Sequence, residues 1–203
     1  MAEISTTRAA SEIRRQQIVD AALQLAQDQA PEAISTQAIA DAAGISQGGL
    51  FRHFPTKDAI WAAAVGWVRE HFLAAIDAAA EAEADPLRKL EAMFLAHAQF
   101  VFEHPAMPRL VFHELQRPIE SALRAEVRSV LVGYRSRVMK ELQASMASGR
   151  VPASLNLSAG MTMYIGMIQG LVMQSAIAEK QNRPIPAARE LFSLYLRAIG
   201  ADK

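Results

Sequence analysis

The 203-residue sequence contains no cysteine. Disulfide bonds, cysteine-ligated metal sites and thiol chemistry are therefore excluded. Strand signals are also missing, because there is no run of alternating β-branched residues and no Asn-Gly hairpin turn. The chain is instead rich in Ala, Leu, Met, Gln, Glu and Arg, the residues that favour helices. We therefore predict an all-α fold.

No stretch is long enough and apolar enough to predict a membrane span. The most apolar stretch, Leu157 to Met173, has 17 residues and includes Ser158, Thr162 and Gln169, whereas a span needs about 20 mostly apolar residues. The N-terminus does not show the basic and then apolar pattern of a signal peptide. We expect no membrane partner, a cytoplasmic location, and a buried helix at a subunit interface for the apolar stretch.

Signatures of catalysis are also missing. There is no nucleophile elbow, phosphate-binding loop or Cys–His pair, and the acidic residues are scattered along predicted helices. His97, His104 and His113 are separated by 7 and 9 residues, and these spacings match no compact metal-binding motif. We predict a protein that is not an enzyme and that has no cofactor and no metal site.

The most informative stretch runs from Ile34 to Ile60 and has the pattern of two short helices joined by a tight turn. Ser35 and Ser46 are expected N-caps, because a serine hydroxyl accepts a hydrogen bond from a backbone N–H of the first helical turn. Gly44 can adopt the left-handed conformation that ends a helix. A long third helix is predicted to begin at Lys57. Two helices joined in this way form a helix-turn-helix, whose second helix can lie in a DNA major groove.

The residues that carry a family resemblance are Ile39-Ala40, Ala43-Gly44-Ile45-Ser46, Gly48 and Leu50-Phe51-Arg52-His53-Phe54-Pro55-Thr56-Lys57. With their spacing intact, they resemble the TetR/AcrR (tetracycline-repressor-like) family of bacterial transcription regulators, over about residues 14–72. The resemblance implies a three-helix helix-turn-helix domain followed by a helical ligand-binding and dimerisation domain, about nine helices in total.

The resemblance also implies a domain organisation and a function. We expect an N-terminal arm and DNA-binding domain over residues 1–56, a linking part of the fourth helix over 57–72, and an effector-binding and dimerisation domain over 73–203. The implied protein is a homodimeric repressor that a small-molecule effector releases from pseudo-palindromic double-stranded operator DNA. The alternative is a helical scaffold or protein-interaction module that uses the same fold without sequence-specific DNA binding.

Nine residues are expected to contact DNA: Thr36, Gln37, Gln47, Gly48, Gly49, Phe51, Arg52, His53 and Lys57. Gln47 can make paired hydrogen bonds to adenine, and Gly48 and Gly49 allow the backbone to approach DNA closely. Arg52 can read guanine or bind phosphate. By resemblance, His53 contacts backbone or base, and Lys57 clamps a phosphate. Phe51 and Gly49 stand where the family often has residues with a hydroxyl, so two phosphate donors are missing.

The charge of this region is low for a DNA-binding domain. Residues 1–60 contain five basic and seven acidic residues, a net charge of −2. Arg14 and Arg15 can neutralise phosphates or be solvated at the start of a helix. We expect residues 1–10 to be a disordered tail, with Arg8 as an alternative DNA contact. Because non-specific affinity scales with the phosphates neutralised, it should be modest.

Outside the two short helices of the motif, helices are predicted over residues 11–29, 57–82, 86–103, 109–116, 118–147, 157–178 and 187–199. The penultimate helix carries Gly160, Gly166 and Gly170 among four methionines, a composition that allows close packing. In the family the last two long helices of each subunit form the dimer interface, so we expect the same here.

Polar or aromatic residues within apolar helix faces are candidates for an effector site. They are Trp67, His71, Phe94, His97, His113, Gln116, Tyr134, Tyr164 and Gln169. His97 and Tyr134 are favoured because they lie in the middle of predicted helices. Each can also be a core or surface residue with a local hydrogen bond.

Overall fold

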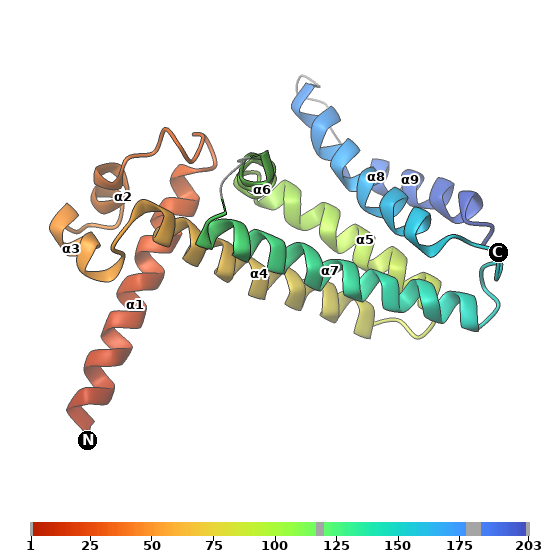
Figure 1. The fold of residues 1–203 in the computed structure, drawn as a ribbon, viewed down its shortest axis with the longest axis horizontal. Coiled ribbons are helices and arrows are strands. Elements are labelled where there is room, and N and C mark those ends of the chain that lie inside the picture. Colours follow the sequence, from red (N-terminus) through yellow and green to blue (C-terminus); the bar gives the residue numbers. More distant parts are fainter. Residues whose placement is uncertain (1, 117–119, 178–183, 202–203) are drawn as a thin grey trace. The chain divides into compact units, whose positions relative to one another are not determined.

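A computed structural model describes residues 2–116, 120–177 and 184–201. Within these ranges the chain consists of α-helices joined by turns and loops, without a strand (Figure 1). The helices are α1 (Ala2–Leu25), α2 (Thr36–Ala42), α3 (Gln47–His53), α4 (Lys57–Glu81), α5 (Pro86–Glu103), α6 (Ala106–Gln116), α7 (Ala122–Ala147), α8 (Leu157–Ile177) and α9 (Pro184–Ala198). The predicted all-α class is confirmed.

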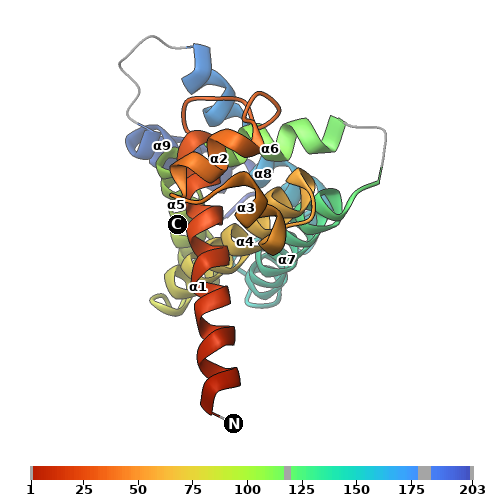
Figure 2. The ribbon, with the colours of Figure 1, turned by 90° about the vertical axis from the view of Figure 1, so that its left-hand side faces the viewer.

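The first helix is longer than predicted. It begins at Ala2, so the expectation of a disordered tail over residues 1–10 is wrong for the described residues. No proline or glycine stands before Ser11 to stop the helix, and alanines and Glu3 favour its continuation. In Figures 1 and 2 the N-terminal half of α1 extends away from α2 and α3.

Two further helix starts differ from the prediction, because a proline interrupts a helix less near its beginning. α6 begins at Ala106 and includes Pro108 in its first turn. The N–H groups of a first turn have no partner within the helix, so a proline there costs no helical hydrogen bond. α9 likewise begins at Pro184, before the predicted start. The predicted start of α7 at residue 118 lies outside the described residues. α7 itself begins at Ala122, where the Ser121 hydroxyl accepts a hydrogen bond from the Arg124 N–H at 3.0 Å.

The chain divides into two compact units. Unit 1 comprises residues 1–69 and 105–129, and unit 2 comprises residues 70–104 and 130–203. In unit 1, α1, α2 and α3 pack against one another around Ile18, Ile39, Leu50 and Phe54, each at most 1% exposed. The inclusion of residues 105–129 was not predicted.

α6 is tied to the loop that follows α1. His113 Nε2 lies 2.6 Å from Glu32 Oε1, and the Arg109 guanidinium donates to the Gln27 carbonyl at 3.2 Å. Lys57 donates to the Glu32 carbonyl at 2.8 Å from the start of α4. Three long side chains therefore hold this loop in unit 1.

Unit 2 has an aromatic core formed by α5, α8 and α9, which pack against one another. Phe94, Tyr164, Phe192 and Tyr195 are at most 1% exposed. The Tyr164 hydroxyl donates to the Leu90 carbonyl at 2.8 Å, which satisfies the buried oxygen. None of the helices in the described ranges has the length and apolar character needed to cross a membrane.

Candidate nucleic-acid interface

The α2–α3 motif has the caps and the turn that its sequence predicts. Ser35 Oγ accepts a hydrogen bond from the Ala38 N–H at 3.0 Å, and Ser46 Oγ accepts one from the Gly49 N–H at 3.1 Å. Between the helices Gly44 has a φ of +67°. This is the left-handed backbone conformation, which residues with a Cβ rarely adopt. Three local features therefore fix the angle between α2 and α3.

α3 has one buried face and one open face. Leu50 is fully buried and anchors the helix to unit 1. On the other side Gly48, Phe51 and Arg52 are exposed, and Phe51 has 43% of its surface accessible. A large exposed aromatic side chain beside a glycine and an arginine forms a surface that can approach a nucleic acid.

A hydrogen bond between the two helices of the motif orients Gln47. Its Nε2 donates to Thr36 Oγ1 at 2.9 Å. Gln37 also makes a side-chain contact, donating to Asp41 Oδ1 at 2.6 Å. The sequence placed Thr36, Gln37 and Gln47 together on the interface but did not predict these pairings.

The two glycines of α3 differ in their surroundings. A Cβ added to Gly48 would meet nothing within 4 Å. A Cβ added to Gly49 would lie 3.2 Å from Ser46 Oγ and 3.8 Å from the Arg52 guanidinium. Gly48 therefore leaves open space on the exposed face, whereas Gly49 lies against its own N-cap.

Arg15 connects α1 to the end of α3. Its guanidinium donates to the His53 carbonyl and stands over the Phe54 ring, 4.1 Å from the centroid. A cation over an aromatic face is attracted by the ring quadrupole. The structure therefore gives Arg15 a packing contact inside unit 1 that the sequence did not predict.

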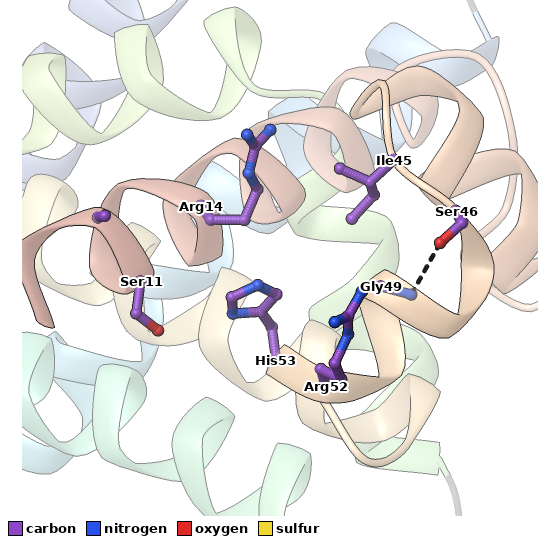
Figure 3. A pocket seen from close by; sticks show the side chains of 8 residues that line it. Ser11, Arg14, Ile45, Ser46, Gly49, Arg52 and His53 are labelled. Atoms are coloured by element: carbon purple, nitrogen blue, oxygen red, sulfur yellow. Dashed lines mark hydrogen bonds between the residues drawn. The ribbon is translucent and has the colours of Figure 1, made fainter. Parts of the chain in front are cut away.

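A groove of about 660 Å³ lies between α1 and α3 (Figure 3). Figure 3 shows Ser11 and Arg14 on the α1 side and Ser46, Arg52 and His53 on the α3 side. Arg14 and Ser11 were outside the nine predicted DNA contacts. The signal that could have found them is their spacing, since residues three apart on a helix share a face.

Four of the predicted effector residues come together in unit 2. The His97 ring lies 4.7 Å from that of Tyr134, and the Phe94 ring lies 5.2 Å from that of Tyr164, between centroids. Phe72, which the prediction omitted, lies 5.0 Å from His97. Phe72 belongs to the apolar stripe of α4, but its position beside α5 follows only from tertiary packing.

His97 is the unusual member of this aromatic cluster. Its Nδ1 is buried and has no hydrogen-bond partner among the described residues. Because burial disfavours the charged imidazolium, the pKa of His97 falls from 6.5 to about 3. Burial also raises the pKa of Tyr134 and Tyr164 above the ordinary value of 10. The cluster is therefore uncharged at neutral pH.

The other five predicted effector residues do not join this cluster. Trp67, His113 and Gln116 belong to unit 1. His71 and Gln169 belong to unit 2 but are exposed. Helical periodicity indicated which residues share a face, but it did not indicate which unit each face meets.

A helix-turn-helix domain with an exposed face on its second helix, together with a helical second unit, defines a class of DNA-binding regulators. Residues 18–64 match the family described as "Bacterial regulatory proteins, tetR family". This match confirms the predicted resemblance to the TetR family of DNA-binding transcription regulators for this part of the chain.

Similar proteins cover nearly the whole chain. Nucleoid occlusion factor SlmA from Marinomonas sp. (strain MWYL1) is 22% identical over 173 residues, covering 85% of this chain and 87% of that protein. The structure of the regulator FadR from Bacillus subtilis with stearoyl-CoA has a TM-score of 0.78 and 19% identity, covering 91% and 98% of the two chains. AibR in complex with isovaleryl coenzyme A and operator DNA has a TM-score of 0.74 and 17% identity, covering 93% and 100%. This chain shares the fold of the FadR and AibR structures.

Proposed function

We propose that this protein is a ligand-responsive repressor that binds a pseudo-palindromic operator as a homodimer and is released by a small-molecule effector. The exposed face of α3, with Gln47 oriented by Thr36, is the observation that carries the proposal. In this arrangement two copies of α3 enter successive major grooves, about 34–36 Å apart.

The Gln47–Thr36 hydrogen bond leaves the Gln47 side-chain amide with one free donor and one free acceptor, the two groups that pair with adenine. A glutamine amide has two N–H donors and one carbonyl acceptor. One N–H is used by Thr36 Oγ1, so one donor and the acceptor remain. Adenine presents N7 as an acceptor and N6 as a donor in the major groove. Thr36 therefore supports base reading by holding the Gln47 amide in place.

Replacing Gln47 with alanine is expected to relax the preference for one base pair in each half-site. The effect corresponds to about 1–3 kcal/mol of discrimination for a bidentate contact. Selection from a randomised operator library measures it. The control is Gln99→Ala, which removes an exposed glutamine on α5 in unit 2. An unchanged preference in Gln47→Ala would show that Gln47 does not read bases.

An exposed stripe on α8 supports the homodimer. Residues 163, 166, 170, 173 and 177 alternate in steps of three and four and are all exposed, which is the spacing of a seam between two packed helices. Met173 has 55% and Ile177 69% of its surface accessible. A Cβ added to Gly166 or Gly170 would meet nothing within 4 Å, so another helix can approach closely.

Replacing Met173 with glutamate should convert the dimer to monomers, because two charges would then be buried without partners. Operator affinity should also fall, because a monomer can bind only one of the two half-sites at a time. Sedimentation velocity and operator titration measure the two effects. The matched control is Val132→Glu, at a residue of α7 that is 60% exposed. A Met173→Glu protein that remains dimeric would rule out this seam.

The aromatic cluster of unit 2 is the proposed effector site. It combines apolar rings with His97 Nδ1, which has no hydrogen-bond partner in the part of the chain that the structure describes, and ligand pockets have this character. The FadR and AibR structures hold acyl-CoA ligands, so an acyl compound is a reasonable first candidate. Residues 57–69 of α4 lie in unit 1 and residues 70–81 in unit 2. In our proposal this helix transmits binding, and the effector needs only a higher affinity for the DNA-incompetent state.

A second candidate role is nucleoid occlusion, the function named for the SlmA relatives. Deleting the gene distinguishes the two roles. Loss of a repressor raises transcript levels of genes beside its operator. Loss of a nucleoid occlusion factor changes where division occurs relative to the nucleoid, without requiring a change in those transcripts.

A further inference from the structure

Unit 2 contains three buried tyrosines, and one of them differs from the other two. The Tyr164 hydroxyl donates to the Leu90 carbonyl at 2.8 Å. The Tyr195 hydroxyl donates to the Gly160 carbonyl at 3.1 Å. The Tyr134 side chain is only 2% exposed, yet its hydroxyl makes no hydrogen bond within residues 2–116, 120–177 and 184–201. A buried polar group without a partner is costly, so its presence calls for an explanation.

A second polar atom without a hydrogen bond lies next to Tyr134. The His97 ring is 4.7 Å from the Tyr134 ring between centroids, in an edge-on arrangement at 83°. His97 Nδ1 is buried and has no partner in the described part of the chain. The Tyr164 hydroxyl affects the pKa of Tyr134, but its own proton is donated to the Leu90 carbonyl. Two neighbouring side chains, from α5 and α7, therefore each hold a polar atom whose hydrogen-bonding capacity is unused.

The surroundings of the His97–Tyr134 pair are aromatic. Phe72 lies 5.0 Å from His97 and 5.2 Å from Tyr134, and Phe100 lies 5.2 Å from Phe72, between ring centroids. Phe72, Phe100 and Tyr134 are buried, whereas His97 keeps part of its surface accessible. A molecule the size of water can therefore touch the His97 ring, so the pair is not sealed on every side.

The pair offers no charge to an ionised ligand. Burial lowers the pKa of His97 to about 3, so its ring is neutral at neutral pH. Arg137 follows Tyr134 by one turn of α7, but Asp77 already binds it through hydrogen bonds of 2.6 and 2.7 Å. Burying a carboxylate among neutral aromatic rings costs far more than burying a neutral polar group. We therefore expect the part of a ligand that contacts the pair to be neutral.

We propose that the His97–Tyr134 pair binds the hydroxyl group of a small neutral phenol, with Phe72 and Phe100 packed against its ring. The ligand hydroxyl can accept a hydrogen bond from the Tyr134 hydroxyl and donate one to His97 Nδ1 in the tautomer protonated at Nε2, so one group satisfies both atoms. Aromatic side chains favour edge-to-face contacts with an aromatic ligand. The inference rests on the effector site proposed above and assigns to it a phenol in place of an acyl compound.

The test compares three probes of similar size, phenol, toluene and benzoate, by calorimetric titration of the wild-type protein without DNA. Phenol should bind. Toluene should bind at least about tenfold more weakly, because it leaves both polar atoms unpaired. Benzoate should also bind more weakly than phenol, because its charge would be buried without a partner. Toluene or benzoate binding as tightly as phenol would overturn the inference.

Tyr134→Phe and His97→Phe distinguish a ligand contact from a structural role. Each should lower phenol affinity towards that of toluene. The Tyr134→Phe protein should keep the wild-type melting temperature, because the hydroxyl that it loses makes no hydrogen bond in the folded protein. The matched control is Tyr195→Phe, which loses the bond to the Gly160 carbonyl and should melt at a lower temperature with unchanged phenol affinity. Wild-type phenol affinity in a folded Tyr134→Phe protein would assign the two polar atoms to a buried water and overturn the inference.

Operator titration with and without phenol separates this inference from the proposed function. If phenol binds in the expected pattern but leaves operator affinity unchanged, the ligand class is supported and release by this site is contradicted. If the wild-type protein does not bind phenol, the inference fails, while operator binding can still be measured. Operator release by an acyl-coenzyme A that Tyr134→Phe does not weaken would likewise overturn the phenol assignment.

Discussion

Replacing His97 with phenylalanine is expected to abolish a pH dependence of stability. The free energy of unfolding of the wild-type protein should fall by about 1.5 kcal/mol between pH 6.5 and pH 5, and that of the variant should not show this fall. The His97 ring packs against Phe72 and Tyr134, and its Nδ1 is buried without a partner among the described residues. Burial lowers the pKa of His97 from 6.5 to about 3 in the folded protein. A histidine at this position is therefore neutral when folded, whereas it becomes protonated in the unfolded chain as the pH falls through this range.

The direction of the change in stability with pH follows from the number of protons that His97 binds in the folded and unfolded chain. Between pH 6.5 and about 3 the unfolded chain binds more protons at His97 than the folded chain. The stability is therefore fully present above pH 6.5 and decreases as the pH falls, by up to about 1.4 kcal/mol per unit. The interval from 6.5 to 5 is informative because most carboxylates remain ionised there.

Urea denaturation at pH 7.5, 6.5 and 5 measures the effect. His97→Phe and His97→Asn should both lack this pH dependence, since neither side chain titrates, although the asparagine variant should be less stable at every pH. This pair separates titration from packing. A wild-type protein with constant stability from pH 6.5 to 5 would show that burial of His97 does not control its protonation.

Replacing Gly48 with alanine is expected to raise stability and lower operator affinity together. Gly48 lies within α3, and an added Cβ meets nothing within 4 Å. Alanine in a helix is favoured over glycine by about 0.5–1 kcal/mol, which should raise the melting temperature by about 1–4 °C for a chain of this size. The same methyl group would occupy the open space through which DNA approaches α3, and we expect operator affinity to fall by about tenfold or more, roughly 1.4 kcal/mol.

The control for this prediction is Gly66→Ala on α4. Its added Cβ would lie 4.0 Å from Glu126, an ordinary contact. This variant should gain stability in the same way and keep wild-type operator affinity. Thermal melts and operator titration at fixed salt measure both quantities. A Gly48→Ala protein with unchanged affinity would mean that DNA does not approach α3 at Gly48.

The features predicted correctly from the sequence are those that depend on neighbouring residues. Ser35, Gly44 and Ser46 form the caps and turn of the α2–α3 motif because each acts within a few positions of itself. α5 begins at Pro86 and ends at Glu103 as predicted, because the Asp85 carboxylate caps it at 3.1 Å and proline suits a first helical position. Local hydrogen bonds and backbone preferences explain this success.

The features that the sequence did not reveal depend on residues far apart in the chain. Arg15 is fixed by the carbonyl of His53, 38 positions away, and no pattern around Arg15 distinguishes it from Arg14. The association of α6 with unit 1 rests on pairs such as His113 and Glu32. A single sequence does not show which helix faces meet, so five of the nine effector candidates lie outside the aromatic cluster.

A footprint of the purified protein on DNA from its own upstream region, across a salt series, tests whether α3 reads an operator. We expect protection of two half-sites about 10–10.5 base pairs apart, or a multiple of this distance, with affinity that falls steeply as salt rises. Equal weak binding to every fragment, without a protected site, would contradict the claim that α3 reads an operator.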